Sequence, residues 1–139
     1  MTLAILGTGG HAKSVYDIVK NKKKIYFFDK EKTIFKVGDK KFKVKSEHEL
    51  LNGHKKEISK VIVTIGNNKI RQKKFNILKK LKYKIATLIH LKSYCGYGAT
   101  IDEGTVVMQG SLINTNSQVG KNCIINSHAS IDHDCLIKD

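Results

Sequence analysis

The C-terminal third of the chain has an apolar residue at every sixth position. From position 95 this slot holds only aliphatic residues or cysteine, and the slot two residues earlier, from position 99, holds only small residues. A period of six fits neither an amphipathic helix nor an ordinary two-sided strand. It predicts a parallel β-helix built from hexapeptides, with three short strands in each coil and the slot residues inside. The apolar slot is Cys95, Ile101, Val107, Ile113, Val119, Ile125, Ile131 and Ile137; the small slot is Ala99, Thr105, Ser111, Ser117, Cys123, Ala129 and Cys135.

Residues 1–90 have the alternating pattern of an α/β domain instead. Short apolar runs are separated by glycine-rich turns and by segments with helical periodicity. Ser46 and Glu49 have capping-box spacing and open a short helix that ends at Asn52-Gly53; we attach no chemistry to His48 or His54. We predict strands at 2–6, 25–28, 61–65 and 85–89, helices at 12–20 and 69–81, and a hairpin of 33–37 with 41–45 around Gly38-Asp39. The two predicted domains, residues 1–90 and 91–139, follow each other almost without a linker.

The first strand, turn and helix have the spacing of a nucleotide-binding fingerprint. Gly7, Gly9 and Ala12 fit the pattern G-x-G-x-x-G/A, and Asp29 follows the next strand, twenty residues after Gly9. Glycines let the backbone approach a phosphate, and a helix N-terminus offers unpaired N–H groups. Asp29 is suited to accept hydrogen bonds from a ribose or a base. The alternative is a tight strand-to-helix turn without a ligand.

A second turn, Gly66-Asn67-Asn68, follows the strand at 61–65 and belongs at the same sheet edge, where ligands of such sheets bind. Arg71, the only arginine, lies on the first turn of the next helix. It is suited to pair with an acid or a phosphate, or to fix the turn.

The formal net charge of +14 is concentrated in residues 1–90, which hold 23 of the 26 Lys and Arg residues but 7 of the 12 acidic ones. The lysines form no stripe interleaved with aromatic residues, so we expect a lysine-rich solvated surface, or attraction of anionic small substrates, and no nucleic-acid partner. No apolar run approaches the roughly 20 residues of a membrane span, and no charged segment of a signal peptide precedes the first strand. The three cysteines are read as buried thiols of a reducing compartment, so we expect a cytoplasmic protein.

Asp132-His133-Asp134 is the most chemically suggestive cluster. An imidazole with an ordinary pKa near ~6.5 can take a proton from an attacking amine or hydroxyl, and a neighbouring carboxylate can hold its tautomer. His133 lies two residues past the inward Ile131, so it is expected to face outward. The alternative is a surface histidine on a turn. His128 with Cys123 or Cys135 has no zinc-ligand spacing, and we expect no metal site.

Three motifs in this order resemble the NeuD/PglD family of bacterial sugar acetyltransferases. They are Gly7-x-Gly-Gly-His-Ala, Ile65-Gly-Asn-Asn-Lys-Ile-Arg71 and Ile131-Asp-His-Asp-Cys135. The resemblance covers the whole chain and implies a Rossmann-like N-terminal domain that binds a nucleotide-sugar. It also implies a left-handed β-helix that trimerises, and transfer of acetyl from acetyl-CoA to a sugar amine or hydroxyl.

The resemblance assigns roles residue by residue. His133 falls on the family's catalytic base, Asp134 on the acidic position that tunes it, and Asn126 on an asparagine near the acceptor group. The positions matching contacts to a UDP- or CMP-linked sugar are Gly10, His11, Ala12, Asp29, Gly66 and Asn67, with Lys30 standing where relatives often have a second acid.

The repeat from Cys95 to Asp139 amounts to two and a half coils, and relatives continue with coils that supply most of the acetyl-CoA groove. We therefore expect a β-helix incomplete at its C-terminus, with weak or no transferase activity and poor trimerisation. One alternative is a nucleotide-sugar-binding module without catalysis. An NAD-dependent oxidoreductase is disfavoured, because the region before the repeat is too short for a dinucleotide fold plus a catalytic domain.

Overall fold

The structure is a computed structural model that describes residues 2–22, 24–52 and 57–139; Gly53 and His54 lie outside these ranges. It consists of two compact units, Met1–Ile85 and Ala86–Asp139, which are described separately below. The division falls five residues before the boundary expected from the sequence. Within the described ranges, every helix is too short or too polar to cross a membrane.

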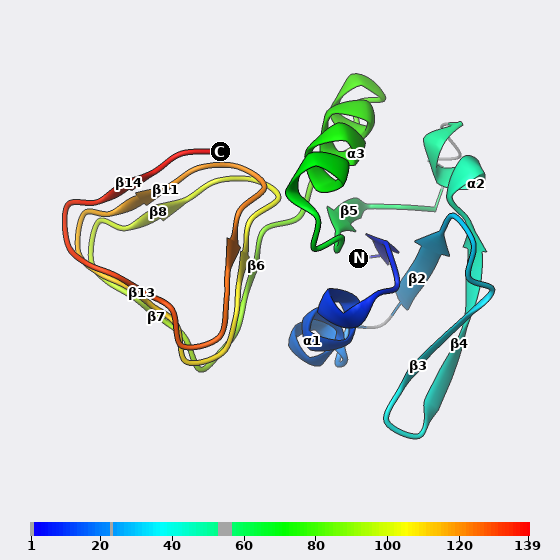
Figure 1. Ribbon diagram of the computed structural model, residues 1–139, viewed down its shortest axis with the longest axis horizontal. Helices are drawn as coiled ribbons and strands as arrows, with labels where there is room; N and C mark the ends of the chain where they lie inside the picture. Colours follow the sequence, from blue (N-terminus) through cyan, green and yellow to red (C-terminus); the bar gives the residue numbers. More distant parts are fainter. Residues whose placement is uncertain (1, 23, 53–56) are drawn as a thin grey trace. The chain divides into compact units, whose positions relative to one another are not determined.

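The first unit is built on a five-stranded mixed sheet with the order β3-β4-β2-β1-β5. The central β1 pairs in parallel with both β2 and β5, and β4 is parallel to β2. The predicted hairpin is confirmed, because β3 runs antiparallel to β4 at the edge (Figure 1). The strands are β1 (Thr2–Leu6), β2 (Lys24–Asp29), β3 (Ile34–Val37), β4 (Lys40–Ser46) and β5 (Lys60–Val63).

Among the described residues of this unit, three helices cover the sheet: α1 (Gly10–Val19), α2 (Glu47–Leu51) and α3 (Asn68–Lys80). Consecutive strand residues point to opposite faces, so Phe27 and Phe28 of β2 enter different clusters. Phe27 packs with Tyr16 of α1 and with the aromatic rings of the hairpin. Phe28 packs with Leu50 of α2 and Phe75 of α3. The sheet therefore has an apolar layer on each face, and its polar loops lie at the strand ends.

The second unit is a parallel β-coil of three three-stranded sheets, β12-β9-β6, β13-β10-β7 and β14-β11-β8. Equivalent residues of neighbouring coils are 18 positions apart, as in the pairs Ile113 with Cys95 and Ile113 with Ile131. The predicted hexapeptide coil is confirmed, and Figure 1 shows its triangular winding. Each strand has two residues: β6 (Leu88–Ile89), β7 (Tyr94–Cys95), β8 (Thr100–Ile101), β9 (Val106–Val107), β10 (Leu112–Ile113), β11 (Gln118–Val119), β12 (Ile124–Ile125), β13 (Ser130–Ile131) and β14 (Leu136–Ile137).

Two hydroxyl groups of the small slot, those of Thr105 and Ser117, join successive coils. Ser117, fully buried, donates a hydrogen bond from Oγ to the carbonyl of Asp132 at 2.5 Å and accepts one from the amide of Cys135 at 3.2 Å. Thr105 joins Gly120 and Cys123 in the same way. A hydroxyl in this slot therefore satisfies backbone groups that the turn leaves unpaired.

A further six-residue pattern lies at the corners, three residues after each apolar slot from Cys95 to Ile131. Every residue there has a positive φ, a conformation that glycine adopts freely and that Asn, Asp and His tolerate better than other residues. This slot was not among the patterns predicted from the sequence. Its members are Gly98, Gly104, Gly110, Asn116, Asn122, His128 and Asp134.

Two expectations were wrong. The predicted strand 85–89 is divided: Ile85 forms a single bridge with Val61 in the first unit, whereas Leu88–Ile89 is β6 and pairs with β9. Ile89 continues the six-residue period one step before Cys95, which explains why it joins the coil. The cysteines are free thiols but are not fully buried, since Cys95 is exposed and the other two are half-buried. Cys95 lies in the first coil of the unit, and Cys123 and Cys135 lie in the third.

Candidate functional site

The glycine turn of the first unit is packed closely against the end of β5. Gly7 has a φ of 99°, and a Cβ placed on it would lie 2.6 Å from the Ile65 side chain. The Thr64 hydroxyl donates to the Gly7 carbonyl at 2.7 Å, and the Gly7 amide donates to Phe28 at 2.8 Å. Any side chain at position 7 would thus be strained and would clash, which gives a structural reason for glycine.

Asp29 holds this turn at the end of β2. Its Oδ2 accepts hydrogen bonds from the Thr8 amide at 2.8 Å and the Thr8 hydroxyl at 2.6 Å. Its Oδ1 accepts from the amides of Glu31 at 3.1 Å and Lys32 at 3.3 Å. Partial burial raises the pKa of Asp29, but the hydrogen bonds outweigh burial and hold that pKa below its ordinary value. The four acceptor positions of the carboxylate are already used within the protein.

A cavity of about 260 Å³ opens beside this turn. Lys74 and Glu47 form an ion pair on its wall at 2.8 Å, with side chains 18% and 13% exposed. Lys32 Nζ donates to the Thr8 carbonyl at 3.2 Å. The three lysines of the wall exceed its two carboxylates, Asp29 and Glu47, by one formal charge, so the cavity is net positive and suited to an anionic ligand. It is lined by Leu6, Gly7, Thr8, Gly9, Asp29, Lys30, Lys32, Glu47, Ile65, Ile70 and Lys74.

Two of the predicted nucleotide-sugar residues, Asp29 and Lys30, line this cavity, and five do not: Gly10, His11, Ala12, Gly66 and Asn67. Ala12 is completely buried in α1. Asn67 caps α3, because its Oδ1 accepts from the Ile70 amide at 3.0 Å. The sequence analysis missed Thr8, Lys32, Glu47 and Lys74. Lys74 is the seventh residue of the lysine-rich helix α3, and nothing in the sequence separates it from the solvated lysines beside it.

Arg71 fixes the second turn, one of the two roles left open by the sequence. Its guanidinium donates to the carbonyls of Ile65 at 3.1 Å and Gly66 at 3.0 Å, and to Asn68 Oδ1 at 2.8 Å. Burial lowers the pKa of His11, and the nearby positive charge of Arg71 lowers it further. Both effects favour the neutral form of the His11 imidazole.

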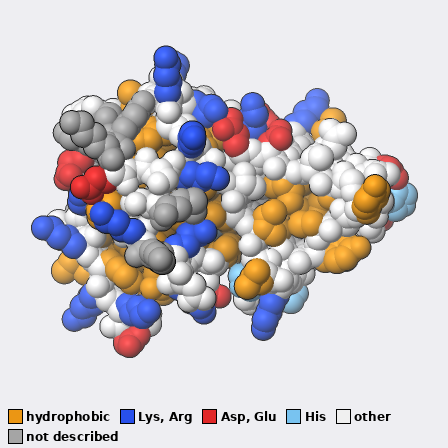
Figure 2. Space-filling view, turned by 180° about the vertical axis from the view of Figure 1, so that it is seen from behind, with side chains coloured by type: hydrophobic (Ala, Val, Ile, Leu, Met, Phe, Trp, Pro, Cys, Tyr) orange, Lys and Arg blue, Asp and Glu red, His pale blue; other side chains and the backbone are white. Residues whose placement is uncertain are grey.

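On the face drawn in Figure 2, Lys and Arg side chains stand at separate points, with acidic, polar and hydrophobic side chains between them.

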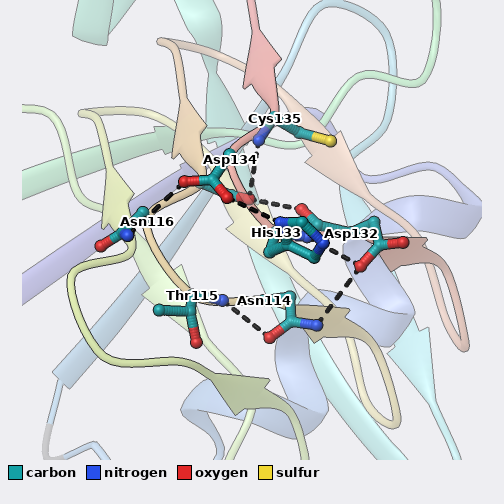
Figure 3. A network of polar contacts seen from close by, with 8 residues as sticks. Asn114, Thr115, Asn116, Asp132, His133, Asp134 and Cys135 are labelled. Carbon is teal, nitrogen blue, oxygen red and sulfur yellow. Dashed lines mark hydrogen bonds and ion pairs between the residues drawn. The ribbon is translucent and has the colours of Figure 1, made fainter.

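The second unit brings His133 and Asp134 together at the corner between β13 and β14 (Figure 3). His133 Nδ1 lies 2.6 Å from Asp134 Oδ2, and both side chains are about two-thirds exposed, at 68% and 66%. The hydrogen bond to Asp134, followed by the negative charge of Asp132, raises the pKa of His133 above its ordinary value. An Nδ1–H that donates to the carboxylate leaves Nε2 with the free lone pair, as a general base requires.

Asn126 lies at a different corner of the coil from His133. It follows β12, whereas His133 follows β13, and these strands belong to different sheets. Asn126 is exposed, and its Oδ1 accepts from the Ser127 amide at 3.0 Å. Within the described residues, no group of three or more His, Cys, Asp or Glu side chains is arranged to hold a metal ion.

Solved structures of longer proteins share this architecture. PerB from Caulobacter crescentus, solved in complex with CoA and GDP-perosamine, is 28% identical with a TM-score of 0.85; the match covers 98% of this chain and 65% of PerB. The acetyltransferase domain of PglB from Neisseria gonorrhoeae, in complex with acetyl coenzyme A, is 32% identical with a TM-score of 0.87; the match covers 99% and 67%. WeeI from Acinetobacter baumannii, at 21% identity and a TM-score of 0.85, shows the fold alone.

The chain thus spans about two thirds of the length of these solved proteins. No curated protein sequence matches it significantly. The PglD N-terminal domain family matches residues 2–78, more than half of the chain. Together with the PerB and PglB structures, this match shows that the chain belongs to the NeuD/PglD-type family of sugar acetyltransferases.

Proposed function

We propose that this protein transfers an acetyl group from acetyl-CoA to an amine or hydroxyl of a nucleotide-activated sugar or sialic acid in surface-glycan synthesis in the cytoplasm. The observation that carries the proposal is the pairing of His133 Nδ1 with Asp134 Oδ2 at an exposed corner of the β-coil. An imidazole oriented by a carboxylate, with its other nitrogen open to solvent, is the arrangement expected of a general base.

The proposed reaction proceeds in the following steps. His133 Nε2 takes the proton of the acceptor amine or hydroxyl as that nitrogen or oxygen attacks the thioester carbonyl of acetyl-CoA. The new C–N or C–O bond gives a tetrahedral intermediate, which collapses with cleavage of the C–S bond. The imidazolium returns the proton to the leaving thiolate, so the products are the acetylated sugar and free CoA. Asp134 stabilises the imidazolium between these two steps.

The nucleotide-sugar is proposed to bind at the cavity beside Gly7–Gly9. Lys30, Lys32 and Lys74 offer positive charge there, and α1 begins at Gly10 without a side-chain cap, so its first N–H groups are available to phosphate oxygens. A Rossmann-like domain, a left-handed β-helix and a homotrimer belong to the same proposal. Support comes from PerB, solved with both CoA and GDP-perosamine, and from PglB, solved with acetyl coenzyme A.

The proposal is tested by acetyl-CoA-dependent transfer to UDP-, CMP- and GDP-linked amino sugars. We expect His133→Asn to lower the rate by about 10²–10⁴-fold, the usual contribution of a general base. The matched control is His128→Asn, an exposed histidine at another corner whose positive φ of 58° asparagine tolerates. Equal rates for His133→Asn and the wild type would overturn the assignment of the base.

A nucleotide-sugar-binding module without catalysis is the second candidate, and the position of the cavity favours it. All the residues that line the cavity belong to the first unit, so ligand binding does not require the coil. Calorimetry that detects a nucleotide-sugar but not acetyl-CoA, with no turnover, would favour this module over the transferase.

A further inference from the structure

Three successive side chains at the His133 corner lie next to three from the preceding coil (Figure 3). Because equivalent residues are 18 apart, Asn114, Thr115 and Asn116 precede Asp132, His133 and Asp134 in the stack. The Asp134 amide donates to the Thr115 carbonyl at 3.0 Å, which fixes the two corners against each other. Each carboxylate beside His133 therefore has an asparagine side chain next to it.

Both asparagines present an amide N–H₂ to these carboxylates. Asn114 Oδ1 accepts from the Thr115 amide at 2.8 Å, so its Nδ2 is left to face Asp132 Oδ1 at 3.4 Å. The same Asp132 oxygen accepts from the His133 backbone amide at 2.8 Å. Asn116 Nδ2 lies 3.5 Å from Asp134 Oδ1, while the other Asp134 oxygen faces the imidazole. The two oxygens of Asp134 are thus divided between Asn116 and His133.

We infer that Asn116 is a positioning residue for His133: its side-chain amide orients the Asp134 carboxylate so that one oxygen faces the imidazole Nδ1. This inference rests on the proposed function of His133 as a base. At 3.5 Å the contact is long for a hydrogen bond, and it acts mainly through the attraction between the amide dipole and the carboxylate.

The backbone conformation at position 116 restricts which residues can orient the Asp134 carboxylate from there. Its φ of 60° favours Gly, Asn or Asp. Glycine, which occupies the equivalent place in the coil before as Gly98, carries no donor. Aspartate would add a negative charge next to Asp134. Asparagine alone among these three residues tolerates the backbone and donates to the carboxylate.

The test uses two substitutions and a control in the full chain, followed by NMR titration of the His133 imidazole. The charged groups that face it are Asp132 and Asp134, and the residues from the preceding coil are uncharged. Asn116→Gly keeps the backbone conformation and removes the amide, so we expect the His133 pKa to fall toward its ordinary value. Asn116→Asp adds negative charge and should raise it. Asn122→Gly makes the same backbone change at another corner, where φ is 56°, and should leave it unchanged.

In the transfer assay, Asn116→Gly and Asn116→Asp should each lower kcat about threefold or more while the KM for acetyl-CoA stays the same. Opposite shifts of the His133 pKa in the two variants, together with a lower kcat in both, would indicate positioning. A purely structural role would shift the His133 pKa in the same direction in both variants. An unchanged His133 titration in Asn116→Gly, or an equal shift in Asn122→Gly, would overturn the inference. Because the titration needs no turnover, its result decides the inference about Asn116 by itself, whereas a transfer rate that His133→Asn leaves unchanged would refute only the proposed function.

Discussion

The substitution Asp29→Asn tests whether the Asp29 carboxylate stabilises the fold or binds the ligand. The substitution keeps the shape of the side chain but replaces one acceptor oxygen by an N–H₂ donor. The remaining oxygen is expected to keep the shorter bonds from Thr8, at 2.8 and 2.6 Å. The new amide then faces the backbone N–H groups of Glu31 and Lys32, which had bonds of 3.1 and 3.3 Å. Losing charge-assisted bonds and opposing two donors should lower the free energy of unfolding by about 2–3 kcal/mol.

The assay is urea unfolding followed by circular dichroism at 222 nm, since α1, α2 and α3 all belong to the first unit. With an m-value of about 2 kcal/mol/M, the midpoint should fall by roughly 1 M. Asp39→Asn, at an exposed position in the hairpin turn, is the control and should unfold like the wild type. If Asp29→Asn keeps the wild-type midpoint and loses only affinity for a nucleotide-sugar, the carboxylate acts on the ligand and the structural reasoning is refuted.

Three further predictions concern the β-coil. Ser117→Ala removes two partly buried hydrogen bonds to the next coil and should lower the free energy of unfolding by about 1–3 kcal/mol; thermal unfolding with an unchanged melting temperature would contradict this. Gly96→Ala places a Cβ 2.7 Å from the Thr115 amide nitrogen and should cost about 1–3 kcal/mol of stability, which denaturant titration measures; an unaltered midpoint would count against such close coil packing. Transfer by His133 needs its neutral form, so a pKa raised above 6.5 predicts a rate that increases with pH through that pKa. Asp134→Asn should move this midpoint to lower pH, and an identical pH profile would refute the pairing.

The coil was predictable because its interior is specified by a single repeated requirement. An inward slot every six residues must be apolar, so Val107, Ile113 and Val119 reveal the period without any long-range information. The same rule extends to Ile89, yet its neighbours Ile85 and Leu88 also resemble an ordinary strand. The division between the first unit and the coil therefore depends on which strand each of these residues pairs with. A local sequence pattern does not show these pairing partners.

The cavity of the first unit was only partly predictable for a similar reason. The sequence located the glycine turn and Asp29 at the sheet edge, because strand order and turn chemistry fix where such loops meet. It did not locate Glu47 and Lys74, which come from two helices and meet in an ion pair on the cavity wall. Nor did it reveal that Asp29 has its acceptor positions filled by neighbouring N–H and O–H groups. Both facts depend on side-chain placement.

The corner slot connects the fold to the proposed chemistry. Position 134 has a φ of 57°, so the coil itself favours Gly, Asn or Asp there. Of these, aspartate is the one that carries a charge, and the turn directs it at the residue immediately before it, His133, at 2.6 Å. The coil therefore needs no special loop to build an imidazole–carboxylate pair, only an aspartate in a slot whose backbone already suits it. His128 and Asn122 occupy the same slot at other corners, so the backbone alone does not create the pair. What distinguishes the His133 corner is the side-chain combination of histidine, aspartate and the asparagine of the preceding coil.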